Sequence, residues 1–226
     1  MAENLEIKAS GTSFDLEYEG EVIHFDLKIT GMFNVYNVLG VIGAALAEKM
    51  KLETIKTALE KFEAVSGRFE LVRKGQDFSV IVDYAHTPDG LENVLKTARE
   101  IAKKRLIVVF GCGGDRDRTK RPIMGRIAAQ LADVVIATSD NPRTEDPEFI
   151  LSQVEEGVLP ALHGNFHEKI TDRKKAIFRA IELAQPDDIV LIAGKGHENY
   201  QILKTGTIHF DDKEVAAEAI RRKMNG

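Results

Sequence analysis

The pattern of apolar and polar residues changes near residue 66. From Gly67 onward, short apolar runs rich in β-branched residues alternate with longer amphipathic stretches. The apolar runs predict strands at 78–84, 105–110, 134–138 and 189–193. The stretches between them predict helices at 88–102, at about 121–131, through Phe149 and Val154, and at 171–184. Buried strands that alternate with helices indicate an α/β fold, in which helices cover both faces of a mostly parallel sheet.

The C-terminal segment and the helix starts also carry recognisable patterns. A hairpin is expected at 201–210, followed by a terminal helix over 211–223 with acids at its start and bases at its end. Thr87 is the expected N-cap of the helix that begins at Pro88. The helix through Phe149 and Val154 is expected to be capped by Thr144 or Asp146, and the helix at 171–184 by Thr171 or Asp172.

The first 66 residues follow a different pattern. Two alternating runs, 14–20 and 21–27, predict a hairpin around Glu19–Glu21, and two helices are expected at 33–50 and 52–62. Two strands and two helices without a central sheet resemble the tail of a larger domain. We therefore expect a domain boundary at Val65–Gly67, with domains 1–66 and 67–226. The helix at 33–50 should expose apolar surface if its parent sheet is absent.

Four of the expected strands end in loops dense in glycine and polar residues. In chain order these loops read DYAHTPDG, GCGGDRDRTKRP, SDNPRTEDP and GKGHENYQ. Ligands of open α/β sheets bind beyond the carboxyl ends of the strands. The position of all four loops therefore predicts a ligand site at this edge.

The second of these loops is rich in basic residues, which are Arg116, Arg118, Lys120, Arg121 and, beyond the proline, Arg126. It is either a flexible solvated loop or a site for an anionic group. The chain contains neither G-x-x-x-x-G-K-[ST] nor G-x-G-x-x-G. This absence argues against a self-contained nucleotide-hydrolysing domain.

The loops together offer both charge types. Arg116 and Arg143 carry guanidinium groups that suit a carboxylate, and Asp140 and Glu198 carry carboxylates that suit an ammonium group. Both charges in one crevice would fit a zwitterion such as an amino acid. His197 is not expected to be a catalytic base.

Four further positions have two interpretations. Asp83 and His86 precede a helix start and could either form that start or face a ligand. Asn34 and Asn37 lie one turn apart on an apolar helix, where an internal cap and a ligand contact explain them equally well.

Composition narrows the class of protein. The formal net charge of −5 argues against a nucleic-acid binder. No apolar run approaches the roughly 20 residues needed to cross a bilayer, and the N-terminus lacks the pattern of a signal peptide. The single cysteine excludes an internal disulfide and a cysteine-built zinc site. A cytoplasmic location is expected.

The motifs resemble those of the Mur ligase family, the ATP-dependent amide ligases that build the peptidoglycan stem peptide. FNVYN, GRFE, DYAHTPDGL, VFGCGGDRDRTKRPIM, DNPR and GKGHE occur in the order of that family. The resemblance covers nearly the whole chain and is strongest to the members that add meso-diaminopimelate, in which DNPR accompanies this substrate.

This resemblance implies a C-terminal Rossmann-like domain at 67–226, preceded by a remnant of the central ATPase domain at 1–66. The UDP-binding domain and the part with the P-loop, the magnesium ligands and the carbamylated lysine would lie outside the chain. Met1 is then expected to be an alternative start, and the chain alone is expected to be inactive. The full enzyme would use ATP, Mg²⁺ and UDP-N-acetylmuramoyl-dipeptide.

Binding residues carry over by motif, whereas no catalytic residue or metal ligand does. The residues implied for meso-diaminopimelate are Arg116, Asp140, Asn141, Arg143, Gly194 and Glu198. The residues implied for ATP are Asn34, Asn37, Arg68, Asp83 and His86. A lysine-adding homologue, a non-catalytic amino-acid-binding module and a dinucleotide-dependent oxidoreductase are the alternatives, and the missing glycine fingerprint argues against the last.

Overall fold

The computed structural model describes residues 2–8, 10–63 and 65–226. The chain divides into two compact units, Met1–Val65 and Ser66–Gly226. The expectation about Met1 as a start concerns a residue outside the described part. No helix of the described residues is long and apolar enough to span a membrane.

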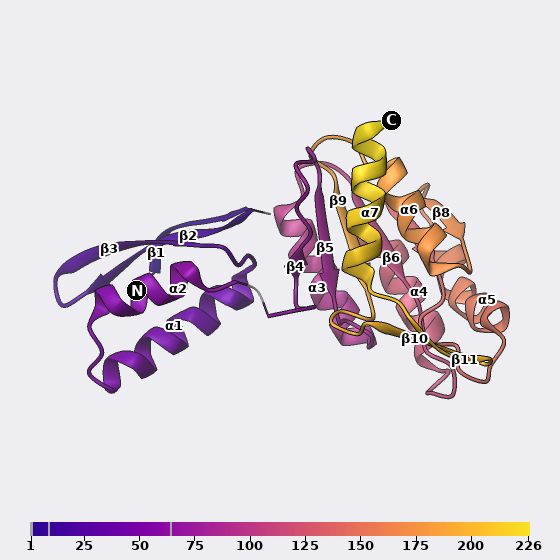
Figure 1. The fold of residues 1–226 in the computed structure, drawn as a ribbon, viewed down its shortest axis with the longest axis horizontal. Helices are drawn as coiled ribbons and strands as arrows, with labels where there is room; N and C mark the ends of the chain where they lie inside the picture. The colour runs from indigo at the N-terminus through magenta and orange to yellow at the C-terminus, as the bar shows by residue number, and fades with distance from the viewer. Residues whose placement is uncertain (1, 9, 64) are drawn as a thin grey trace. The chain divides into compact units, whose positions relative to one another are not determined.

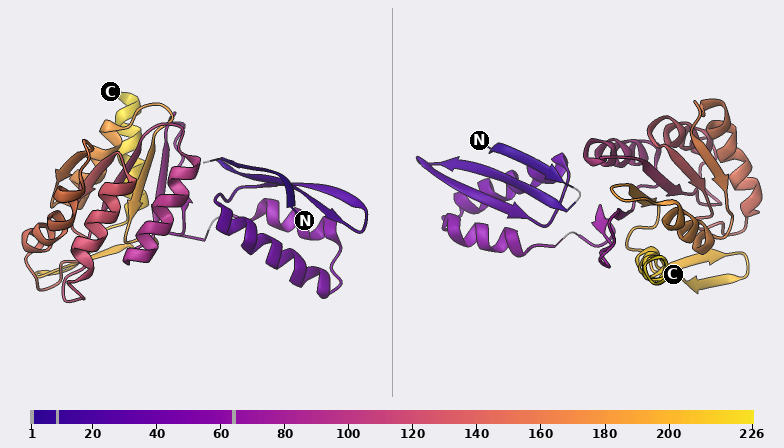
Figure 2. Two further views of the ribbon diagram at one scale, coloured as in Figure 1. Left: turned by 180° about the vertical axis from the view of Figure 1, so that it is seen from behind. Right: turned by 90° about the horizontal axis from the view of Figure 1, so that it is seen from above.

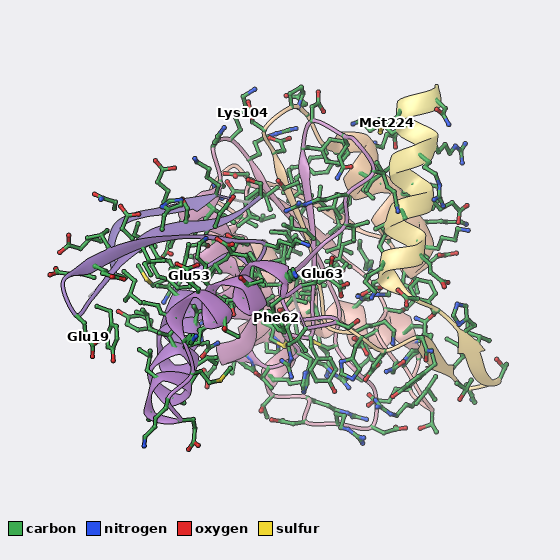
Figure 3. All side chains as sticks on the ribbon, turned by 60° about the vertical axis from the view of Figure 1, so that its left-hand side comes forward. Glu19, Glu53, Phe62, Glu63, Lys104 and Met224 are labelled. Carbon is green, nitrogen blue, oxygen red and sulfur yellow. The ribbon has the colours of Figure 1, made fainter. Side chains whose placement is uncertain are left out.

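The first unit is a three-stranded antiparallel sheet with two helices. The strands β1 (Ala2–Lys8), β2 (Gly11–Tyr18) and β3 (Glu21–Leu27) pair in that order (Figure 1). The helices are α1 (Met32–Ala47) and α2 (Leu52–Lys61). The predicted hairpin and helices are confirmed, and Glu19 lies in the hairpin turn (Figure 3).

The interpretation of this region as two strands was wrong, because β1 was missed. None of the residues of its sequence AENLEIK is fully buried, and the sequence shows only a weak alternation of apolar and polar residues. The core of the unit forms instead between β2, β3 and the helices, where Phe14 stacks on Phe25 with ring centroids 5.1 Å apart.

Helix α1 exposes large apolar side chains, as its sequence predicted. Met32, Phe33, Tyr36 and Val41 are between 38% and 69% exposed. An exposed apolar helix face of this kind is typical of a surface that packs against further protein.

The second unit is built on a six-stranded sheet within the described residues. Its order is β4-β5-β9-β6-β7-β8, and every pairing is parallel except that of β4 with β5. The strands are β4 (Glu70–Leu71), β5 (Ser79–Asp83), β9 (Ile189–Ala193), β6 (Leu106–Phe110), β7 (Val134–Ala137) and β8 (Phe166–Lys169). The predicted α/β fold with a mostly parallel sheet is confirmed.

Helices cover both faces of this sheet (Figures 1 and 2). One face packs against α3 (Pro88–Ile101), α4 (Lys120–Leu131) and α5 (Pro147–Val158), which is followed by the 3₁₀ turn η1 (Leu159–Ala161). The other face packs against α6 (Arg173–Leu183) and α7 (Asp212–Asn225), whose last turn carries Met224 (Figure 3). Successive residues of one strand enter opposite layers, as Val108 and Val109 of β6 do.

Most of the predicted element boundaries and caps are close to those observed. Thr87 caps α3 by accepting a hydrogen bond from the Gly90 N–H, and Asp146 and Asp172 cap α5 and α6. The predicted hairpin is β10 (Tyr200–Leu203) with β11 (Gly206–His209). The short edge strands β4 and β8 were not predicted. Strand β4 has only two residues, and the sequence of β8, FHEK, is half polar, so neither strand shows a clear alternation of apolar and polar residues.

Candidate functional site

The sheet order places the four polar loops next to one another. They follow β5, β9, β6 and β7, which are consecutive neighbours in the sheet. Strand β9 lies between β5 and β6, so the chain order and the spatial order differ at this point. A parallel sheet offers its ligand crevice where the strand order reverses, beyond the carboxyl ends.

The loops after β6 and β7 are tied together through their backbones. The Gly114 N–H donates to the Asn141 carbonyl at 2.9 Å, and a Cβ on Gly114 would lie 1.9 Å from the Pro142 carbonyl oxygen. Asp115 accepts from the Thr144 hydroxyl at 2.7 Å, which lowers the pKa of its carboxyl. Glycine at 114 is therefore required for the contact between the two loops.

Arg143 is held in a left-handed backbone conformation, with φ of 52°. Its N–H donates to the Ile202 carbonyl at 3.0 Å, and its Nη1 donates to the carbonyls of Gly114 and Asn141 at 2.9 and 3.3 Å. Such a conformation in a non-glycine residue costs about 1–3 kcal/mol and concentrates at functional sites. In the described part of the chain, the hydrogen bonds of this guanidinium come from Nη1. The edge formed by Nε and Nη2 therefore suits the two parallel bonds of a carboxylate.

A buried network connects the loops after β7 and β9. Asn141 donates from Nδ2 to Glu198 Oε2 at 3.1 Å, and its Oδ1 accepts from the Ile202 N–H at 2.9 Å. Lys195 donates from Nζ to Asn141 Oδ1 and to Glu198 Oε2, both at 3.1 Å. The Lys195 side chain is fully buried and that of Glu198 is 17% exposed. Asn141 and Lys195 both donate to Oε2 of Glu198, so its carboxylate keeps positions that can accept hydrogen bonds from a ligand.

Asp140 and Gly194 lie in direct contact beside this network. Asp140 is buried and accepts the Asn141 N–H on Oδ1 at 2.6 Å. Gly194 has φ of 120°, and a Cβ there would lie 2.7 Å from Asp140 Oδ2. The contact requires glycine and makes Asp140 a residue that organises the loop.

The basic residues of the GCGGDRDRTKRP loop make different contacts. The buried Arg121 forms two bonds to Glu145, at 3.0 and 2.9 Å, and Arg118 pairs with the same carboxylate at 3.1 Å. Lys120 donates to the His86 carbonyl at 2.8 Å. Arg116 is exposed and donates to the carbonyl of Asp115 at 3.0 Å. Arg116 is thus exposed and, unlike Arg118 and Arg121, can reach a ligand without breaking the ion pairs with Glu145.

A second cluster surrounds Tyr84, which sequence reasoning did not select. The Arg68 guanidinium lies 5.0 Å from the ring of Tyr84, and the rings of His86 and His197 lie 4.7 and 5.1 Å from it. Gly67 packs against this region so closely that a Cβ on it would lie 2.0 Å from the backbone nitrogen of His197. The motifs GRFE, DYAH and GKGHE therefore meet at one aromatic side chain.

Asp83 is occupied by backbone donors. Its Oδ2 accepts from the Phe69 N–H at 2.8 Å and its Oδ1 from the Ala85 N–H at 2.7 Å. Burial raises the pKa of this carboxyl, which the two backbone bonds oppose. Both bonds lie outside α3, whose N-cap is Thr87, so Asp83 holds the backbone beside β4 and the loop before the helix.

Asn34 and Asn37 belong to the first unit. Asn34 is half-buried and donates from Nδ2 to the Thr30 carbonyl at 2.9 Å, which is the internal bond considered above. Asn37 is exposed. The premise that both amides are buried was wrong, because α1 turns this face outward.

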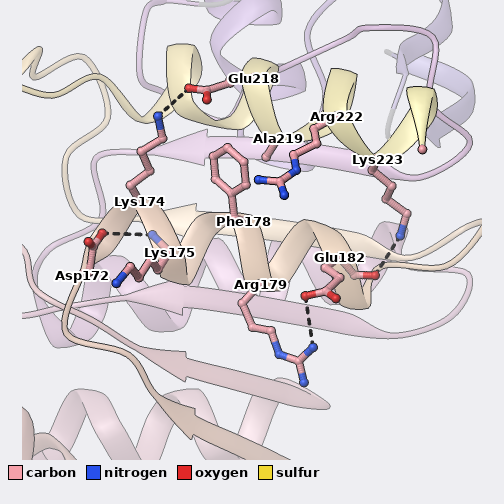
Figure 4. A pocket seen from close by; sticks show the side chains of 11 residues that line it. Asp172, Lys174, Lys175, Phe178, Arg179, Glu182, Glu218, Ala219, Arg222 and Lys223 are labelled. Carbon is pink, nitrogen blue, oxygen red and sulfur yellow. Dashed lines mark hydrogen bonds and ion pairs between the residues drawn. The ribbon is translucent and has the colours of Figure 1, made fainter.

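A groove of about 760 Å³ lies elsewhere, between α6 and α7 (Figure 4). Two ion pairs lie in its lining: Lys174 contacts Glu218 at 2.7 Å and Arg179 contacts Glu182 at 3.2 Å. The groove is on the helical face, away from the strand-end motifs, and basic side chains outnumber acidic ones in its lining.

Metal ligands are not gathered in the part of the chain that the structure describes. No group of three or more histidine, cysteine, aspartate or glutamate side chains there could hold an ion.

The arrangement defines an α/β domain in which four polar loops follow neighbouring parallel strands at their carboxyl ends. The chain belongs to the Mur ligase family: residues 67–196 match the family described as "Mur ligase, glutamate ligase domain". The expected family membership is confirmed.

Known relatives agree with this assignment. The chain is 52% identical over 224 residues to UDP-N-acetylmuramoyl-L-alanyl-D-glutamate–2,6-diaminopimelate ligase of Syntrophomonas wolfei, covering 99% of the chain and 46% of that protein. It is 53% identical over 222 residues to the enzyme of that name from Clostridium botulinum, covering 97% of the chain and 45% of that protein. The chain thus spans about half the length of these relatives.

Solved structures give the same fold. A structure of a UDP-N-acetylmuramoyl-L-alanyl-D-glutamate–2,6-diaminopimelate ligase superimposes with a TM-score of 0.80 and 39% identity, over 99% of this chain and 45% of that chain. UDP-N-acetylmuramate–alanine ligase of Thermotoga maritima superimposes with a TM-score of 0.66 and 21% identity, over 99% and 45% of the two chains. The second likeness concerns the fold alone.

Proposed function

We propose that this chain is the C-terminal part of a bacterial, cytoplasmic ligase that adds meso-diaminopimelate to the D-glutamate of UDP-N-acetylmuramoyl-L-alanyl-D-glutamate. The observation that carries the proposal is the junction of the loops after β6, β7 and β9, which holds Arg143 and Glu198 in one network. The names and identities of the relatives support the same substrate.

The proposed site uses the two charge types separately. The free edge of Arg143 grips the distal carboxylate of meso-diaminopimelate, which lysine lacks. Glu198 accepts hydrogen bonds from an ammonium group of meso-diaminopimelate, and the exposed Arg116 binds its other carboxylate. Asn141, Asp140 and Gly194 hold these groups in place, because their own polar atoms are largely used by the protein.

The cluster around Tyr84 is proposed to complete the nucleotide site. Arg68 offers a guanidinium to phosphate, and Tyr84 and His86 offer aromatic surface. Asn34 and Asn37 of the first unit are proposed as further nucleotide contacts, and the first unit as the end of the ATPase domain. Asp83 would act through the backbone that it holds.

When bound, ATP with Mg²⁺ would supply the activation: its γ-phosphoryl group would pass to the substrate carboxylate with release of ADP, and an amino group would then displace phosphate from this acyl phosphate. The residues of this chain bind and orient that amino group and exclude water from the reaction. The described residues provide no cluster that could hold the metal ion, so we assign this chain no step at the metal.

The test is the KM for meso-diaminopimelate in a full-length ligase that carries this chain as its C-terminal part. Arg143→Ala should raise that KM at least about tenfold, because a charged hydrogen bond contributes about 1.5–3 kcal/mol. The KM for ATP should not change.

Arg126→Ala is the matched control, since Arg126 is an exposed arginine of α4 outside the loops. An unchanged KM in Arg143→Ala, or an equal rise in both variants, would contradict the assignment of Arg143. A higher rate with lysine than with meso-diaminopimelate would favour the lysine-adding alternative.

A further inference from the structure

Two buried side chains of opposite charge lie beneath the candidate site. Arg173 is the first residue of α6 and Asp212 is the first residue of α7, and both side chains are 0% exposed. Arg173 donates from Nε to Asp212 Oδ1 at 2.8 Å and from Nη2 to Oδ2 at 2.7 Å. The pair is therefore bidentate and out of contact with solvent.

The same guanidinium also reaches the ends of two strands. Arg173 Nη1 donates to the Ser139 carbonyl, just beyond β7, at 3.3 Å. Its Nη2 donates to the Ala193 carbonyl, at the end of β9, at 3.1 Å. Strands β7 and β9 both pair with β6 and not with each other. The sheet ladder thus leaves the distance between their loops to other contacts, and Arg173 provides one.

The gap that Arg173 bridges is the gap that the candidate site spans. On its ligand side, Asn141 bonds to Glu198, and Gly194 lies against Asp140. A change in the spacing of the two loops would therefore move Arg143 relative to Glu198. Arg143 and Glu198 were proposed above to hold the distal carboxylate and an ammonium group of one amino acid.

We propose that Arg173, oriented by Asp212, is a positioning residue that sets the spacing between loop 139–143 and loop 194–198. The inference rests on the proposed function for its effect on substrate affinity. Its effect on the loops themselves does not depend on that function. The alternative is that the pair only joins α6 to α7.

An apolar double variant, Arg173→Met with Asp212→Leu, separates these two roles. Replacing both members of a buried pair by apolar residues of similar size is often neutral for stability, whereas removing one member leaves a buried charge. The variant should therefore fold, while the carbonyls of Ser139 and Ala193 lose their shared donor.

Lys174→Ala with Glu218→Ala is the matched control. This neighbouring pair also joins α6 to α7, at 2.7 Å, but both side chains are about half exposed and neither bonds to a strand-end loop. A role confined to joining the helices predicts similar, small effects in both double variants.

The first measurement is hydrogen exchange of two backbone amides without ligand. The Arg143 N–H is bonded to Ile202 and the Gly194 N–H to Asp83. Both should exchange at least about tenfold faster in the Arg173/Asp212 variant than in the wild-type chain or the control. The second measurement is the Kd for meso-diaminopimelate by calorimetry, which should rise at least about tenfold in the same variant only.

A folded Arg173/Asp212 variant with wild-type exchange at both amides would overturn the inference. If that variant does not fold, Arg173→Lys decides, since it keeps the charge but not the planar fork. Faster exchange of the two amides in Arg173→Lys supports the inference, and unchanged exchange overturns it. Absence of meso-diaminopimelate binding by the wild-type chain counts against the proposed function, while the exchange result still decides the role of Arg173.

Discussion

At the scale of single residues, Lys195 shows how a site is held by a group that need not touch the ligand. Its ammonium group is fully buried, bonds to Asn141 and Glu198, and lies 5.4 Å from the ring centre of Tyr200. A buried charge is retained only where such partners compensate for its lost hydration. The negative charge of Glu198 in turn raises the pKa of the Tyr200 hydroxyl. Lys195 therefore fixes both the position and the charge balance of the network.

Lys195→Met should lower the free energy of unfolding by about 1–3 kcal/mol, because the buried acceptors Asn141 Oδ1 and Glu198 Oε2 each lose a hydrogen-bond donor. Urea unfolding of the chain at pH 7 measures this. Lys174→Met, which breaks the half-exposed pair with Glu218, should cost about 0–1 kcal/mol. Equal losses of unfolding free energy in the two variants would contradict a larger contribution of the buried network to stability.

At the scale of elements, one carboxylate joins helix α4 to two loops. Glu145, which follows Arg143 in the loop after β7, accepts two bonds from Arg121 and one from the Asp115 N–H at 2.6 Å. The bonds from Arg121 lower the pKa of Glu145 to about 2. The start of α4 and the two loops thus depend on Glu145 being ionised.

This dependence gives a pH window for stability. The pKa of Glu145 in the folded chain lies below its ordinary value of 4.5, so its stabilisation is complete above about pH 5 and is lost as the pH falls towards 2. Over this window the wild-type chain should lose up to about 3 kcal/mol that Glu145→Gln does not lose.

Urea unfolding at intervals between pH 5 and pH 2 measures the difference. Glu156→Gln, an exposed glutamate on α5, is the control and should follow the wild type. Parallel pH profiles for wild type and Glu145→Gln would contradict the assigned coupling.

At the scale of the whole molecule, the sequence predicted the fold and the location of the site for the same reason. The strands β5, β6, β7 and β9 are apolar runs buried on both faces, and their ends carry the polar loops. The rule that ligands bind beyond strand ends then locates the site without knowledge of the strand order.

The pairings within the site could not be predicted in this way. Whether a loop arginine points inward, as Arg121 does, or outward, as Arg116 does, is decided by residues distant in the chain. The partners Arg173 and Asp212 are 39 residues apart and lie at two helix starts, where charged residues usually serve the helix dipole. Tyr84 and Lys195 were passed over because their motifs also contain more familiar ligand groups.

The central claim is that the strand-end loops of this chain form a site for meso-diaminopimelate. Its most direct test is a titration of the isotope-labelled chain with meso-diaminopimelate and, separately, with L-lysine, followed by backbone amide NMR. The account predicts saturable shifts in 139–143 and 194–198 with meso-diaminopimelate, and a Kd for L-lysine at least about tenfold weaker, because L-lysine lacks the distal carboxylate. Equal affinity for the two amino acids, or saturable shifts confined to other parts of the chain, would contradict it.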